Sequence, residues 1–140
     1  MDGIPPQIDL SVVTPDKQVV HESVDSVTFP GKRGYLGILP GHAPLLTELR
    51  IGEIEYFAHG KKHYLAVFWG FAEVLPDRVI VLAHTAERAE DIDIERAERA
   101  WQRAEERLKK PGETDLDLER ARIALERAVV RLQAANRLHS

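Results

Sequence analysis

The last fifty residues of this chain hold one proline and one glycine, and the two are adjacent, at Pro111 and Gly112. The first ninety residues carry the other seven prolines and eight glycines. Inside a helix, glycine costs about 1 kcal/mol and proline about 3 kcal/mol relative to alanine, so a long stretch without them favours helix. The distribution predicts two helices joined by a turn at Pro111-Gly112, preceded by a region of short strands and turns.

The first ninety residues show the alternation of half-buried strands. Ile8, Leu10 and Val12 alternate with polar neighbours, and a turn at Thr14-Pro15-Asp16 ends the run. Further short strands are predicted at residues 19–20, 24–29, 51–57, 64–69, 71–75 and 79–83. Short strands at spacings near ten residues, with no helical pattern between them, are typical of an antiparallel sandwich.

From about residue 89 the apolar period becomes helical. The first expected helix has one face formed by Ala97, Trp101, Ala104 and Leu108. The second has a two-position heptad seam of Leu118, Ala121, Leu125, Ala128, Leu132 and Ala135. Asp91 or Asp93 can cap the first helix, and Thr114 or Asp115 the second. The sequence thus predicts an α+β chain, with residues 1–88 as an antiparallel β-sandwich domain and residues 89–140 as an antiparallel helical hairpin.

Composition narrows the possible functions. The chain has no cysteine, which removes disulfides, thiolate metal sites and cysteine nucleophiles. Net charge is −4 and no segment is strongly basic, so a nucleic-acid partner is not expected. No apolar run approaches the roughly 18 residues that span a bilayer, so direct membrane insertion is not expected either.

Arginines on the second expected helix differ from the rest of the hairpin. Most hairpin arginines have an acidic residue three or four positions away, as Arg120 has in Asp117. The corresponding neighbours of Arg127 and Arg131 include no acid, and these two lie one turn apart on roughly the face of Arg120. They could clamp a polyanion, because guanidinium groups match phosphate oxygens bidentately. They could equally contact acids on the other helix or on a partner.

Other motifs do not indicate catalysis. His59 and His63 flank a predicted turn without an evident third ligand, so no metal site is expected. Gly31, Gly34 and Gly37 precede no Gly-Lys-Ser/Thr sequence, which excludes a Walker-type loop. Neither a nucleophile elbow nor a paired-carboxylate frame is present, so we expect no catalytic residues and no enzyme activity of the chain by itself.

One stretch is apolar and rich in turn residues, and it could be either an interior connection or a stiff contact loop: Gly34-Tyr-Leu-Gly-Ile-Leu-Pro-Gly-His-Ala-Pro-Leu-Leu-Thr47. It resembles the signature loop of the epsilon subunit of bacterial F-type ATP synthases. The resemblance extends over the whole chain, through Ile8–Val13, Val79–Ala86 and the Ile92-Asp93 junction. It implies a ten-stranded sandwich followed by a helical hairpin, in a non-catalytic subunit.

The resemblance also implies partners and a location. The sandwich would bind the gamma subunit and touch the polar loops of the membrane c-ring. Tyr35, Ile38, Leu39 and His42 map onto the ring-facing loop, although some relatives carry an acid where this chain has Tyr35. The hairpin would move between a compact form and an extended form that reaches the catalytic alpha and beta subunits and inhibits ATP hydrolysis. The complex would place the chain peripherally, at the cytoplasmic face of the plasma membrane.

ATP is the regulatory ligand that the resemblance implies for the compact form. In several relatives a motif of Ile or Leu, Asp, two variable residues, Arg and Ala binds ATP, and residues 92–97 match it. The implied site consists of Glu87, Ile92, Asp93, Arg96, Ala97, Arg120, Arg127 and Arg131. The turn at Pro111-Gly112 is expected to bring the second-helix arginines back toward Asp93 and Arg96. The alternative is a purely structural stalk scaffold that does not bind nucleotide.

Overall fold

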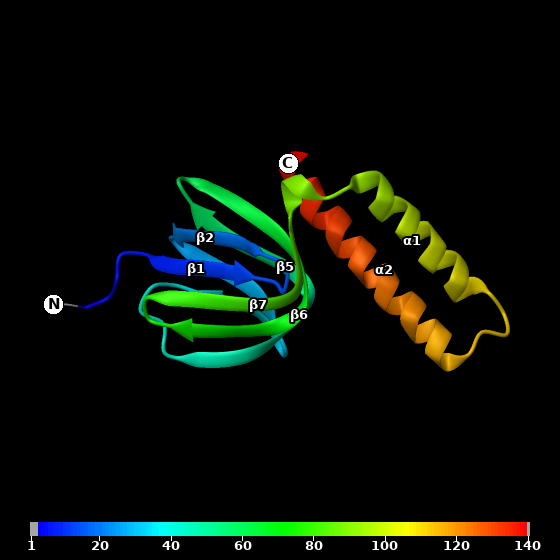
Figure 1. Ribbon diagram of the computed structural model, residues 1–140, viewed down its shortest axis with the longest axis horizontal. Helices are drawn as coiled ribbons and strands as arrows, with labels where there is room; N and C mark the ends of the chain where they lie inside the picture. Colours follow the sequence, from blue (N-terminus) through cyan, green and yellow to red (C-terminus); the bar gives the residue numbers. More distant parts are fainter. Residues whose placement is uncertain (1–2, 140) are drawn as a thin grey trace. The chain divides into compact units, whose positions relative to one another are not determined.

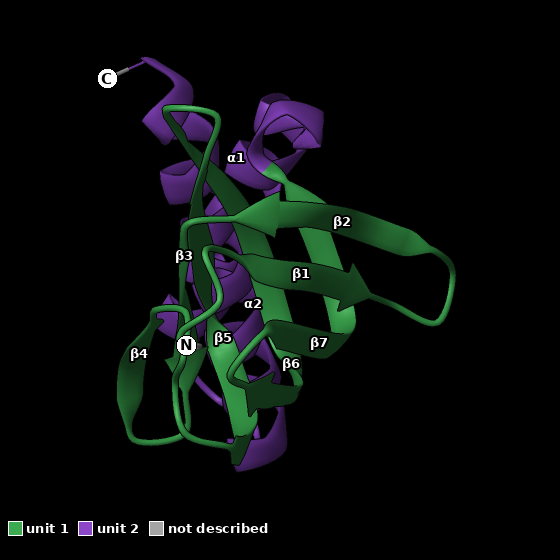
Figure 2. Cartoon of the chain, turned by 90° about the vertical axis from the view of Figure 1, so that its left-hand side faces the viewer, with its two compact units in different colours: residues 1–88 green, residues 89–140 purple. Residues whose placement is uncertain are grey.

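A computed structural model describes residues 3–139 of the chain. The chain forms two compact units, and it passes from the first to the second between Arg88 and Ala89 (Figure 1 and Figure 2). The first unit contains seven strands: β1 (Ile8–Val13), β2 (Gln18–Val24), β3 (Ser26–Gly31), β4 (Gly34–Ile38), β5 (Leu45–Ala58), β6 (Lys61–Leu75) and β7 (Arg78–Arg88). The second contains η1 (Ala89–Asp91), α1 (Ile94–Lys109), α2 (Asp115–Asn136) and η2 (Arg137–His139).

The strands of the first unit form one sheet in the order β2-β1-β7-β6-β5-β3-β4. Within residues 3–139, every pairing is antiparallel except that of β1 with β7, which is parallel, so the predicted antiparallel sandwich contains one parallel pair. The sheet folds over a core: Tyr56 on β5 donates a hydrogen bond to Glu22 on the edge strand β2. A core of apolar side chains from all seven strands fills the space between the two layers.

Three long strands turn a corner of this sandwich together. On β6 the core side chains are Leu65 and Val67 before the corner and Ala72 and Val74 after it. Alternate residues of a strand share a face, so the five-residue step from Val67 to Ala72 means that the strand has exchanged faces. The same exchange occurs on β5 between residues 49 and 54, and on β7 between residues 83 and 86. Strands that bend in this way pass from one layer of a sandwich to the other.

The corner of β6 lies at Trp69 and Gly70. Both have positive φ, of 56° and 144° respectively. A Cβ on Gly70 would lie 2.1 Å from the carbonyl oxygen of Leu82, so only glycine lets β6 approach β7 this closely. The sequence predicted two separate strands here, residues 64–69 and residues 71–75. The backbone instead continues through residue 70 as one strand, β6. Counting the two halves of β5, β6 and β7 separately gives the ten strands that were expected.

The stretch 34–47 is also more regular than the sequence suggested. Its first five residues form β4, and Leu45 begins β5, so the loop itself comprises residues 39–44. The interpretation of the whole stretch as a loop was wrong, because its glycines and prolines concealed the strand β4 and the start of β5. The amide of Gly41 donates to the carbonyl of Pro76 at 2.8 Å, which fixes the loop to the turn between β6 and β7.

The second unit is a helical hairpin, with a turn at Pro111-Gly112 as expected. Asp93 caps α1 and Thr114 caps α2, each by accepting a hydrogen bond from a first-turn amide. The helices pack along the predicted faces, and the residues most deeply buried there are alanines: Ala97, Ala104, Ala121, Ala128 and Ala135. Among the described residues, no helix has the length and apolar character that crossing a bilayer requires.

Candidate functional site

The two arginines singled out on α2 lie in partly buried surroundings. Arg127 and Arg131 are both half-buried, and the Nε atom of Arg127 is inaccessible to solvent. By contrast Arg122, on the same helix, is exposed and pairs with Glu119 at 2.6 Å. Burying a guanidinium is unfavourable without compensating polar contacts. The positions of Arg127 and Arg131 therefore differ physically from those of solvated surface arginines.

Arg120 occupies a different part of α2. Its Nη1 atom lies 4.0 Å from a carboxylate oxygen of Asp117, and its side chain is exposed. Eleven residues separate it from Arg131, which is about 16 Å along a helix axis. The last turns of α2 and the η2 turn contact η1, so Arg131 lies at the end of the hairpin where α1 begins. The hairpin thus brings Arg127 and Arg131 toward the start of α1 and leaves Arg120 nearer the turn.

The four fixed positions of the predicted ATP motif lie at the start of α1 and just before it. Asp93 is exposed, and its Oδ1 accepts a hydrogen bond from the amide of Arg96 at 3.1 Å. Arg96 is exposed, Ile92 is half-buried, and Ala97 is buried against α2. The carboxylate of Asp93 is therefore committed to the helix cap, while the guanidinium of Arg96 faces solvent.

Glu87 lies in the first unit, one residue before the end of β7, where it is half-buried. Its neighbour Arg88 is part of a polar network at the same end of the sandwich. Arg88 donates to the hydroxyl of Tyr56 at 3.4 Å, and that hydroxyl donates to Glu22 at 2.8 Å. The ring of His63 stacks on Tyr56 with 4.7 Å between centroids. Sequence reasoning missed this network, because its members are scattered over four strands.

The network makes the free energy of unfolding of the sandwich sensitive to pH in the alkaline range. Burial first, and the hydrogen bond to Glu22 second, raise the pKa of Tyr56 from 10.0 to about 12, against the opposing effect of Arg88. Below pH 10 the phenol is protonated in both states, and between pH 10 and 12 only the unfolded chain loses the proton. We expect the free energy of unfolding to fall by about 2–3 kcal/mol across this window.

Urea denaturation at pH 9 and pH 11.5 measures this loss. Tyr56→Phe should reduce the difference between the two pH values, since it removes the titrating group. Tyr35→Phe, which leaves Tyr56 in place, is the matched control and should keep the loss of the parent protein. Equal losses in all three proteins would contradict the assignment to Tyr56.

The four predicted ring-contact residues are not equally accessible. Ile38 is only 2% exposed and belongs to the sandwich core, so it supports the loop from inside. Leu39 and Tyr35 are exposed, and His42 is half-buried with its Nδ1 2.6 Å from the carbonyl oxygen of Ala43. Accessible contacts in this region would therefore come mainly from Leu39 in the loop and from the ring of Tyr35 on β4.

Tyr35 is held in place by β5. Its hydroxyl accepts a hydrogen bond from the amide of Glu53 at 3.0 Å. A Cβ on Gly52 would lie 2.6 Å from the Tyr35 hydroxyl and 2.7 Å from Pro30, so a glycine is required beneath the ring. Tyr35 therefore presents a fixed aromatic face rather than a free hydroxyl.

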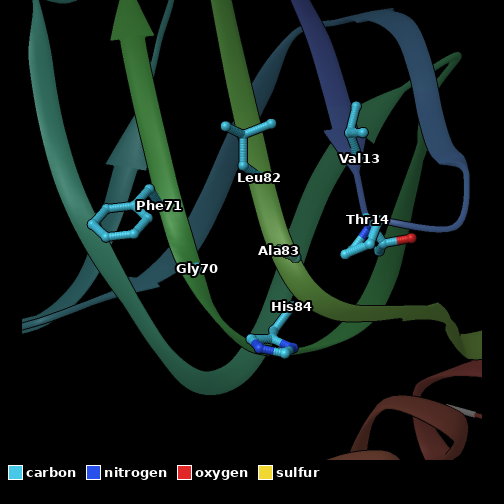
Figure 3. Close-up of a pocket in the computed structure, with 8 residues that line it drawn as sticks. Val13, Thr14, Gly70, Phe71, Leu82, Ala83 and His84 are labelled. Carbon is cyan, nitrogen blue, oxygen red and sulfur yellow. The ribbon is translucent and has the colours of Figure 1, made fainter.

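A hollow of about 400 Å³ opens on the outer side of β1, β6 and β7, and its lining is mainly apolar (Figure 3). We call it the apolar hollow; it is lined by Val13, Thr14, Pro15, Gly70, Phe71, Leu82, Ala83 and His84. Phe71 and Leu82 are a directly opposed cross-strand pair, exposed by 51% and 56%. Sequence reasoning missed it, although two large apolar residues at outward positions of adjoining strands were a visible signal. No group of His, Asp or Glu side chains within residues 3–139 is arranged to hold a metal ion.

Family comparisons cover nearly the whole chain. Residues 7–89 match the family described as ATP synthase, Delta/Epsilon chain, beta-sandwich domain. Residues 90–136 match ATP synthase, Delta/Epsilon chain, long alpha-helix domain. The two matches follow the order of the sandwich and the hairpin.

Individual relatives agree. The chain is 54% identical over 134 residues to the ATP synthase epsilon chain of Thermodesulfovibrio yellowstonii, covering 94% of this chain and 96% of the relative. It is 48% identical over 129 residues to that of Geotalea uraniireducens, covering 92% and 94%.

Solved structures show the same fold. A chain in the Euglena gracilis mitochondrial ATP synthase, OSCP/F1/c-ring, superposes with a TM-score of 0.82 at 29% identity, covering 96% of this chain and 84% of that one. A chain of the Tetrahymena thermophila mitochondrial ATP synthase central stalk/c-ring matches in fold alone, with a TM-score of 0.56 at 12% identity, covering 99% of this chain and 100% of that one. The protein belongs to the family of ATP synthase epsilon chains and is a non-catalytic subunit.

Proposed function

We propose that the protein is a central-stalk subunit of a rotary, proton-translocating ATP synthase. It couples the gamma subunit to the polar loops of the c-ring, as a peripheral protein at the cytoplasmic face of the plasma membrane. Its hairpin is a movable inhibitor of ATP hydrolysis that contacts the alpha and beta subunits when extended. ATP binding favours the compact form, so a falling ATP concentration releases the hairpin by population shift.

The observation that carries the nucleotide part is the pair Arg127 and Arg131. They lie one turn apart on α2, half-buried, near the end of the hairpin where the ATP-motif residues of α1 begin. Guanidinium groups bind phosphate oxygens through bidentate, charge-assisted hydrogen bonds, so two of them one turn apart can contact a triphosphate together. Arg96 adds a third, solvent-facing guanidinium on α1. Glu87 and Arg120 join the proposed site on the family resemblance.

Titration of the full-length protein with ATP by calorimetry tests this proposal. Arg127→Ala and Arg131→Ala should each weaken ATP binding by about 10–100-fold, the loss expected for a hydrogen-bonded charge on phosphate. Arg122→Ala is the matched control, because Arg122 lies on the same helix and pairs with Glu119. Absence of heat at millimolar ATP, or unchanged binding in Arg127→Ala, would refute the nucleotide proposal and leave the stalk role intact.

The stalk role is supported by apolar surface on the sandwich. In the apolar hollow, Phe71 and Leu82 are exposed to solvent. Leu39, in the 39–44 loop, and Leu46, just after it, are exposed as well. Soluble monomers rarely expose contiguous apolar patches of this kind, whereas subunits of assemblies do. We assign the hollow to the gamma subunit and the loop to the c-ring.

The alternative function is a scaffold that fastens partners and binds no nucleotide. The apolar surfaces favour it as much as they favour the regulated subunit. Under this alternative, Arg127→Ala and Arg131→Ala would weaken assembly or inhibition, and the parent protein would give no ATP signal.

A further inference from the structure

The apolar hollow continues into a wider outer face of the sheet, which the strand register defines. Phe71 and Glu73 lie on either side of a core residue of β6, so both point away from the core. Leu82 on β7 lies directly opposite Phe71 (Figure 3). Glu73 is flanked by Leu46 on β5 and by Ile80 on β7. We call these five residues the mixed patch: Leu46, Phe71, Glu73, Ile80 and Leu82.

The apolar members of the mixed patch are accessible to solvent. Leu46 is 71% exposed, Leu82 is 56% exposed and Phe71 is 51% exposed, whereas Ile80 is half-buried. Side chains of this size on adjoining strands form a continuous apolar surface, not scattered single residues. A partner that covers this surface must also cover the glutamate in the middle of it.

Within residues 3–139, the carboxylate of Glu73 has no salt bridge and accepts no side-chain hydrogen bond. The charged residues diagonal to it in the register already have partners. On β7, Arg78 lies 3.3 Å from a carboxylate oxygen of Asp77. On β5, Glu48 lies 3.8 Å from the Nζ atom of Lys32. Water alone therefore solvates the Glu73 carboxylate in the free protein.

Covering the mixed patch removes that water. Transfer of an unpaired carboxylate into an apolar contact is strongly unfavourable, and it opposes the gain from burying the apolar side chains. A cation on the partner removes this penalty if it reaches the carboxylate. Arginine does so best, because its guanidinium group binds both carboxylate oxygens. The mixed patch is therefore complementary to a surface that is apolar around one basic side chain.

We propose that the mixed patch binds a segment of the gamma subunit that is apolar except for one arginine or lysine, and that Glu73 forms an ion pair with this basic side chain in the complex. The proposal rests on the stalk role proposed above, in which the apolar hollow contacts the gamma subunit. The apolar residues supply the contact area. Glu73 supplies specificity, because an apolar surface without a cation would leave its carboxylate unpaired.

Interferometry with the purified gamma subunit and the full-length protein tests the ion pair, because the direction of the effect is decisive. Glu73→Gln keeps the shape of the side chain and removes its charge, so the cation of the partner is left unpaired. We expect binding at least about tenfold weaker, and a similar loss in Glu73→Leu although leucine adds apolar area. Glu73→Lys should bind more weakly still, since it places two like charges together.

Glu55→Gln is the matched control for loss of a glutamate. Glu55 lies on β5 outside the mixed patch and pairs with Lys62 at 3.9 Å. This variant should bind the gamma subunit as the parent protein does. If no cation faces Glu73, then Glu73→Gln and Glu73→Leu lose only a desolvation penalty and bind as tightly as the parent or more tightly. That result would overturn the proposal.

The outcomes separate this proposal from the stalk role. If the parent protein does not bind the purified gamma subunit, the proposed stalk role fails and the ion pair fails with it. If the parent binds and Glu73→Gln binds as Glu55→Gln does, the stalk role stands and the ion pair alone is overturned. Tighter binding of Glu73→Lys would show an acidic partner surface, and it would overturn the ion pair as well.

Discussion

Replacing Gly70 by alanine should destabilise the sandwich by about 4 kcal/mol or more, the largest effect that we expect from any single methyl group in this chain. The added Cβ would lie 2.1 Å from the carbonyl oxygen of Leu82 and 2.8 Å from the Cα of Ala83. Both contacts are with backbone, which cannot rotate away as a side chain can. In addition, the φ of 144° at this position strains any residue with a Cβ. Urea denaturation followed by circular dichroism measures the loss.

Gly34→Ala is a matched control for this prediction. Gly34 has nearly the same φ, 138°, but a Cβ there would meet no atom within 4 Å. It should therefore show the conformational penalty alone, about 1–3 kcal/mol. The difference between the two variants isolates the clash at the corner. Equal losses would mean that β6 and β7 can separate at Gly70 at little cost.

Introducing two carboxylates into the apolar hollow should abolish binding to the gamma subunit while leaving the fold intact. Phe71→Glu with Leu82→Glu places both charges on a half-exposed cross-strand pair, so lost apolar burial and like-charge repulsion should lower the unfolding free energy by about 2–4 kcal/mol without unfolding the sandwich. Burying those charges under a partner costs several kcal/mol, which predicts at least a hundredfold weaker complex. Co-purification and interferometry with the purified gamma subunit provide the measurement.

Phe57→Glu supplies the control for this surface. Phe57 is an exposed aromatic residue toward the far end of β5, outside the apolar hollow. It should bind gamma as the parent does. If the double variant retained parental affinity, the hollow would not be the gamma contact. An equally weak Phe57→Glu variant would point to a general effect of added negative charge.

Local patterns were sufficient to predict the two units and the caps. The exclusion of glycine and proline from residues 113–140 identified α2, and the heptad seam identified its packed face, since both depend on nearest neighbours along one helix. The continuity of β6 was not predictable in this way. Gly70 looks like a strand end in the sequence, and only the backbone of β7 beside it explains why a glycine continues the strand.

In the candidate site, too, the features set by neighbours along the chain were predictable, and those set by contacts between distant strands were not. Arg127 and Arg131 could be predicted as site residues because the positions three and four residues away from them on the same helix hold no Asp or Glu. The network of Arg88, Tyr56 and Glu22 could not, because it joins residues 32 to 34 positions apart on three strands. Burial of Ile38 was hidden for a related reason: its neighbours in the loop are exposed, and only pairing of β4 with β3 turns its side chain inward.

The corner shared by β5, β6 and β7 has a mechanical consequence. In a sandwich of two separate sheets, a sideways force on one layer is resisted only by interdigitated side chains, which can slide. Here three unbroken backbones run through both layers, so such a force is carried as tension along covalent chains and their ladders of hydrogen bonds. A central-stalk subunit gains from this construction, because a sideways force on one layer passes to the other along the backbone rather than by shear in the core.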